Sequence, residues 1–203
     1  MKNDDELAEL IIRNVPDIEH AMQFLDEYVT PRLAESIFDI FQDGVGSAQL
    51  YCDDRKDPGG WFCPEHWLLP ESKKKDADVW FQIDTPEDDP WESWVAQFCG
   101  GAPAANTSAL LVRYNGARIG KRRWLELRNA MPTQMEMLSR AGFLIEGDQI
   151  YYPLPIDREK LATAAGKGAM AGALGKIMEA AAALDKAMPA FEALFQAQRK
   201  IKD

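Results

Sequence analysis

The sequence predicts an α+β fold, with N-terminal helices, a mixed, mostly antiparallel sheet of about four to six strands with flanking helices, and a long C-terminal helix. Three observations support this prediction. Apolar residues recur at helical spacing in residues 1–46, and short runs typical of strands alternate with turn residues in residues 47–156. Residues 157–203 are rich in alanine and carry one apolar stripe.

The composition is that of an ordinary globular protein. With 46% hydrophobic and 28% charged residues, the 203-residue chain is neither collagen-like, disordered nor a disulfide scaffold. Its net charge of −10 argues against a dedicated nucleic-acid coat, because phosphate binding needs Lys and Arg. No apolar run is long enough to cross a membrane. Three cysteines and the lack of a signal peptide predict a cytoplasmic protein with reduced thiols.

The N-terminal segment, residues 1–46, is expected to be a helical layer packed on the core. Four apolar residues at helical spacing predict a short first helix: Leu7, Leu10, Ile11 and Val15. A second helix is expected to begin near Pro16-Asp17, with a kink or break at Pro31, because proline removes a helical hydrogen bond. Glycines 44 and 46 should end it.

The central segment, residues 47–156, is expected to form the α/β core. The expected strands are 48–52, 61–68, 79–84 and 109–114, with a hairpin over 143–152 that turns at Gly147-Asp148. The expected helices are one that begins at Pro90 and ends at Gly100-Gly101, and two over 121–131 and 133–141. Among the tryptophans, Trp80 and Trp94 fit inward-facing positions, whereas Trp61 and Trp67 flank turn residues and are expected to be more exposed.

The C-terminal segment, residues 157–203, should contain one helix over 157–165 and a longer one over 168–200. The stripe on the longer helix has two interpretations. It either packs on its own domain or binds a partner, and in the latter case residues 168–200 could make the protein a homo-oligomer.

The motifs for common chemistry are incomplete. Cys63-Pro64-Glu65-His66 resembles half of a zinc site but has no second ligand pair, and only two histidines exist to serve as a base for a nucleophile. No phosphate-binding glycine loop is complete. We therefore expect no cofactor and no catalytic residues.

The order of the predicted elements over residues 17–114 resembles that of the restriction-endonuclease-like core. The signature of that family, Pro-Asp followed by Asp/Glu-x-Lys, holds a divalent cation. Pro16-Asp17 and Asp54-Arg55-Lys56 match it by letter but lie outside the expected strand positions, so the resemblance implies a degenerate site. The alternative function is thus a metal-dependent, nuclease-like hydrolase that uses a nearby acidic run: Asp84, Glu87, Asp88 and Asp89. The same run also suits a helix N-terminus, with Asp89 as its cap.

One basic segment stands out against the acidic chain. Residues 113–128 contain six basic residues and one acidic one, and two aromatic residues lie among them. The candidate partner-binding residues are Arg113, Arg118, Lys121, Arg122, Arg123, Trp124 and Arg128. They either contact a phosphate group of a nucleic acid or an acidic partner, or pair with the protein's own acidic surface.

The function expected from these features is that of a non-enzymatic, intracellular binding or regulatory module that recognises another macromolecule. A protein partner fits best. The protein would then act as an adaptor, or as an inhibitor whose acidic face imitates nucleic-acid phosphate.

Overall fold

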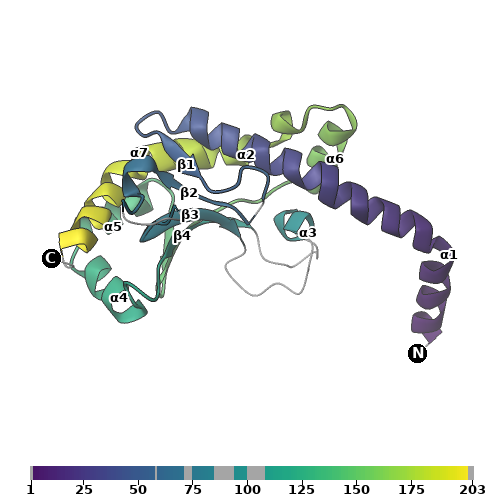
Figure 1. Ribbon diagram of the computed structural model, residues 1–203, viewed down its shortest axis with the longest axis horizontal. Helices are drawn as coiled ribbons and strands as arrows, with labels where there is room; N and C mark the ends of the chain where they lie inside the picture. Colours follow the sequence, from purple (N-terminus) through teal and green to yellow (C-terminus); the bar gives the residue numbers. More distant parts are fainter. Residues whose placement is uncertain (1, 58, 71–74, 85–93, 100–107, 201–203) are drawn as a thin grey trace.

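The computed structural model describes residues 2–57, 59–70, 75–84, 94–99 and 108–200 (Figure 1). It confirms the predicted α+β class and resolves the sheet into six antiparallel strands in the order β1-β2-β3-β4-β6-β5. The strands are β1 (Leu50–Cys52), β2 (Trp61–Pro64), β3 (Val79–Asp84), β4 (Ala109–Tyr114), β5 (Leu144–Glu146) and β6 (Gln149–Pro153). The α-helices are α1 (Lys2–Phe24), α2 (Thr30–Gly44), α3 (Trp94–Phe98), α4 (Lys121–Asn129), α5 (Pro132–Arg140), α6 (Arg158–Gly166) and α7 (Gly175–Lys200).

Residues 2–44 form one long helical path rather than two helices divided at Pro16. Pro16 lies inside α1, where the helix continues. The expected disturbance at Pro31 takes the form of a π-helical turn, Leu25–Val29, directly before it. The N–H of Thr30 bonds to the carbonyl of Leu25, five residues back. Because Pro31 has no N–H to donate, the wider turn lets the chain pass it without a break.

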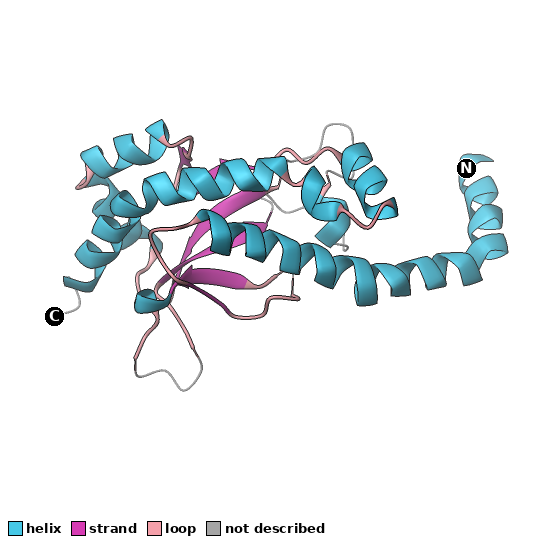
Figure 2. Cartoon of the chain, turned by 90° about the horizontal axis from the view of Figure 1, so that it is seen from above, coloured by secondary structure: helices cyan, strands magenta, loops and turns pink. Residues whose placement is uncertain are grey.

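The core lies between one face of the sheet and the helices α2 and α7 (Figure 2). Side chains of β3 alternate between buried and half-buried positions, and the buried Phe81 contacts Phe191 of α7 with ring centroids 5.2 Å apart. Gly44 at the end of α2 lies so close to α7 that an added Cβ would meet the Ala181 Cβ at 2.7 Å. Small residues therefore let the two helices pack closely.

The stripe of α7 is used inside the chain. Twelve of its residues are buried, including Ile177, Leu184, Phe191 and Leu194, and Pro189 is accommodated within the helix. The expected helix over 168–200 begins only at Gly175, after a separate 3-10 turn at Met170–Ala173. Of the two interpretations of its stripe, the burial of α7 supports packing on its own domain.

Among the tryptophans, the expected exposure was wrong for Trp67, whose side chain is fully buried. A 3-10 turn, Glu65–Trp67, directs the indole between Phe81 and Phe195, with ring centroids 5.6 Å and 4.8 Å away. Its N–H donates to Glu192 at 2.8 Å. Trp61, Trp80 and Trp94 are half-buried.

Candidate functional site

The basic segment 113–128 runs from the end of β4 through a loop into α4. Acidic side chains from other parts of the chain meet three of its six cations, and Glu126 within the segment meets a fourth. The ion pairs are Arg113–Asp84 at 2.9 Å, Arg118–Asp76 at 3.0 Å, Arg118–Asp78 at 3.6 Å, Lys121–Asp148 at 2.8 Å and Arg122–Glu126 at 3.0 Å. Pairing with the protein's own acidic surface therefore accounts for most of the segment.

Two of the candidate partner-binding residues lie in the interior. Trp124 is 1% exposed, stacks on Tyr114 with ring centroids 5.1 Å apart, and donates its indole N–H to the carbonyl of Asp148. Arg128 is 6% exposed and donates to the carbonyl of Gly147 at 2.8 Å. Both side chains fix the β5–β6 turn onto α4, so neither is available to stack on a base or contact a phosphate.

Asp148 is the electrostatic centre of this turn. The hydrogen bond from Lys121 is the main cause that lowers the pKa of Asp148, and a 2.9 Å bond from the hydroxyl of Tyr114 adds to it, while burial acts in the opposite direction. Burial lowers the pKa of Arg128, which the charge of Asp148 partly offsets. These groups stabilise the β5–β6 turn. Among the paired cations of the segment, the side chain of Arg122 is the most exposed, at 92%.

Asp148→Asn is expected to destabilise the protein by about 1 kcal/mol at neutral pH, because it removes a charge-assisted bond that is partly exposed. Since folding lowers this pKa, the carboxylate stabilises the fold fully above its unfolded pKa of about 3.9, and that stability is lost as the pH falls through the folded value. Urea unfolding at neutral pH and near pH 2.5 should show the difference between wild type and variant shrinking in acid. An equal difference at both values would contradict this role.

The letters of the endonuclease signature lie apart and serve other contacts. Asp17 is exposed on α1, whereas Asp54-Arg55-Lys56 follows β1. Arg55 pairs with Asp39 and lies over the Phe38 ring, 4.7 Å from its centroid. Lys56 lies 3.8 Å from Glu35, so this loop is attached to α2.

Metal binding finds no support in the part of the chain that the structure describes. There, no group of three or more His, Cys, Asp or Glu side chains could hold an ion. Asp84 pairs with Arg113, and Glu87, Asp88 and Asp89 lie outside the described residues. The metal-dependent hydrolase thus stays a prediction without a described ligand set.

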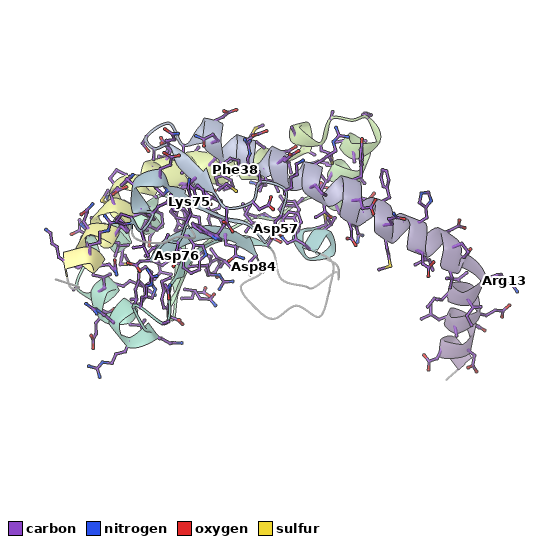
Figure 3. The ribbon with its side chains drawn as sticks, in the orientation of Figure 1. Arg13, Phe38, Asp57, Lys75, Asp76 and Asp84 are labelled. Atoms are coloured by element: carbon purple, nitrogen blue, oxygen red, sulfur yellow. The ribbon has the colours of Figure 1, made fainter. Side chains whose placement is uncertain are left out.

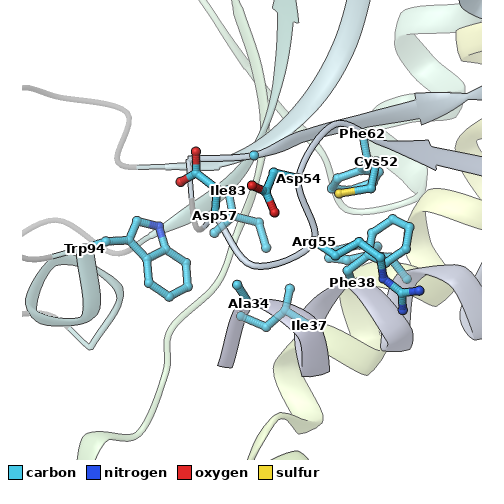
Figure 4. A pocket seen from close by; sticks show the side chains of 12 residues that line it. Ala34, Ile37, Phe38, Cys52, Asp54, Arg55, Asp57, Phe62, Ile83 and Trp94 are labelled. Carbon is cyan, nitrogen blue, oxygen red and sulfur yellow. The ribbon is translucent and has the colours of Figure 1, made fainter. Parts of the chain in front are cut away.

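A small pocket lies between α2 and the β1–β2 loop (Figure 4). Its volume is about 30 Å³, enough to hold only a few water molecules. Asp54 and Asp57 are among its lining residues, but each accepts a backbone N–H of its own loop, from Lys56 and Gly59. The nearby Cys52 is a poor nucleophile because burial raises its pKa to about 11. This pocket does not suit a substrate.

Most of the exposed large apolar side chains in the described part of the chain lie on α1 and the π-helical turn that follows it. This helix projects from the body of the protein (Figure 1). We define the α1 stripe as five of its exposed apolar residues at helical spacing: Leu7, Ile11, Val15, Ile18 and Met22. Their exposures run from 36% to 59%, and Leu10, Ile12, Phe24 and Tyr28 add further exposed apolar surface. Contiguous apolar surface of this kind on a folded protein marks an interaction site.

Sequence reasoning found the periodicity of this stripe but assigned it to the core. An amphipathic helix has the same pattern whether it packs on its own sheet or on another protein. One signal in the sequence favours pairing with a helix of another protein: apolar residues alternate steps of three and four, as in the seam between two paired helices. We call this row the seam; its residues are Ala8, Ile11, Val15, Ile18, Met22, Leu25 and Val29.

The comparisons with known proteins add no relative. No protein-family model matches the chain, and neither a curated protein nor a solved structure matches it. Among the described residues, no helix is both long and apolar enough to span a membrane.

Proposed function

We propose that this chain is a non-enzymatic, protein-binding module, an adaptor or regulatory subunit that holds its partner through the α1 stripe. The carrying observation is that large apolar side chains project from the body on α1, where the most exposed, Ile12, reaches 75%. Burying one such side chain is worth about 1.5–3 kcal/mol. A stripe of five therefore provides enough apolar surface for a specific complex.

The rest of the molecule fits a scaffold that presents this arm. The long helical path from α1 into α2 is anchored because α2 buries Leu33, Ile37 and Phe41 against the core. The small pocket, the paired cations and the three free cysteines, of which Cys63 is buried and the others half-buried, offer no complete catalytic group among the described residues. The helix α1 is thus fixed to the body at its C-terminal end, and the rest of it is exposed.

The double variant Ile11→Glu/Ile18→Glu tests this proposal. Both residues are exposed, so the melting temperature should stay within about 2 °C of wild type. After cross-linking in the cells that make the protein, wild type should retain a specific partner that the variant loses, because each glutamate would be buried unpaired in the interface.

Arg13→Glu/His20→Glu is the matched control. Both of these residues are exposed on α1 and lie outside the stripe, and the control also adds two acidic residues. It should retain the partner. A stripe variant that keeps every partner of the wild type would overturn the proposal.

A further inference from the structure

We propose that the occupant of the α1 stripe is an amphipathic helix of another protein, with an apolar seam bordered by basic residues. This inference rests on the proposed function and names the chemistry of its partner. Three features of α1 support it: the spacing of the stripe, the charge around it, and the bend of the helix.

The spacing selects a helix as the partner. Within α1, the seam from Ala8 to Met22 alternates steps of three and four residues, so these side chains face one side of the helix over about two heptads. Leu25 and Val29 continue the spacing in the sequence but lie in the π-helical turn. This repeat accepts the ridges of another helix, with knobs from one entering holes of the other. A strand, whose side chains alternate with a period of two, does not match it.

The charge selects a basic partner. Residues 2–29 contain eight acidic and only two basic residues, Lys2 and Arg13. Glu19 directly follows the seam residue Ile18 and therefore borders the seam within α1, and Asp26 follows Leu25 in the π-helical turn. Arg13 is bonded to Glu9 on the acidic face. Lysine or arginine beside the partner's seam would meet these carboxylates, and complementary charge of this kind sets partner choice.

The same charge disfavours two other occupants. A second copy would bring another segment 2–29 with a net charge of −6 against the first, so part of the apolar gain would be lost to repulsion. An anionic membrane surface would repel the acidic face, whereas helices that lie on such membranes carry Lys and Arg there.

The bend of α1 also argues against symmetric self-pairing. Figure 1 shows that α1 bends, and Figure 3 places Arg13 on the outer side of that bend, near the middle of the helix. Ile11 and Val15 are two residues from Arg13, about 200° around the helix, so the stripe lies on the inner side. Two concave stripes facing each other would leave a gap at the bend, whereas a crossing helix can be enclosed by one of them.

The test uses designed helical peptides as probes and the full chain. One peptide has a leucine seam bordered by lysines, the second has glutamates in place of those lysines, and the third is a scrambled version of the first without a seam. Fluorescence anisotropy measures binding to wild type, to Ile11→Glu/Ile18→Glu and to Arg13→Glu/His20→Glu. Light scattering gives the mass of each protein, and co-sedimentation with phosphatidylserine-containing vesicles tests the membrane.

The expected result is a monomer that binds the lysine peptide at least about tenfold more tightly than the glutamate peptide, a difference of about 1.4 kcal/mol. The stripe variant should lose this binding, the Arg13→Glu/His20→Glu control should keep it, and added salt should weaken it. The scrambled peptide should not bind, because it lacks a seam.

Each other outcome overturns a definite statement. Equal binding of the two seam peptides would show that the partner need not be basic, but the proposed function would still stand. A wild-type dimer that the stripe variant dissociates would identify a second copy as the occupant and likewise leave the proposed function. Vesicle binding that depends on the stripe would overturn the proposal of a helical partner. A monomer that binds neither seam peptide would overturn it too. If such a monomer also has no cross-linked partner in cells, the proposed function is overturned as well.

Discussion

Replacing Trp67 by alanine is expected to lower the free energy of unfolding by about 3–5 kcal/mol, the range for removing a large aromatic side chain from a packed core. The indole is fully buried between rings from the sheet and from α7. The truncation leaves a cavity at the contact between β3 and α7, which are the centre of the fold. It also leaves Glu192 without one of its hydrogen-bond donors.

Urea unfolding followed by far-UV circular dichroism measures this effect without relying on tryptophan fluorescence. Trp61→Ala is the matched control, because Trp61 is half-buried and its removal opens no enclosed cavity. The control should lose clearly less stability. Equal losses for the two variants would mean that Trp67 is not the core residue that the structure shows.

Much of the central sheet could be predicted from local sequence alone. The strands 79–84 and 109–114 have the bounds expected from their apolar runs, and the hairpin turns at Gly147-Asp148 as predicted. Strong β-type side chains and turn residues determine these elements over a few residues, so no distant contact is needed to recognise them.

What depends on distant contacts could not be read in the same way. The role of Trp67 follows from a 3-10 turn and from Phe195, which lies more than a hundred residues further along the chain. The basic segment looked like a binding patch because its neutralising partners, among them Asp76 and Asp148, are brought to it only by folding. Periodicity shows that a helix has an apolar face but does not show which surface covers it.

The α1 and α7 helices illustrate this limit in opposite directions. Both carry an apolar stripe in the sequence, and the sequence interpretation assigned α1 to the core and left α7 open to self-association. In the structure, α7 is buried along most of its length, while the stripe of α1 is exposed. The difference lies in the contacts, since Ala181 and Gly44 let α7 approach α2 closely and Phe191 contacts Phe81 of the sheet, whereas α1 extends past the end of the body (Figure 2).

Leu184→Asp is therefore expected to unfold the protein rather than to change its assembly. Leu184 is fully buried in α7, so the new carboxylate would be enclosed by apolar side chains without a partner. A cost of about 4 kcal/mol or more is a large part of the stability of a typical domain. If α7 instead served self-association, the variant would stay folded and only its mass in solution would fall.

Met178→Asp is the control for this variant, because it places the same carboxylate on the same helix at a residue with 51% of its surface exposed. It should keep the wild-type circular dichroism spectrum and melting temperature within about 2 °C. Calorimetry and light scattering of both variants measure fold and mass together. A folded Leu184→Asp protein of smaller mass would mean that α7 serves in assembly. If Leu184→Asp loses the cooperative unfolding transition and Met178→Asp keeps it, α7 belongs to the core. The exposed helical face for a partner is then that of α1.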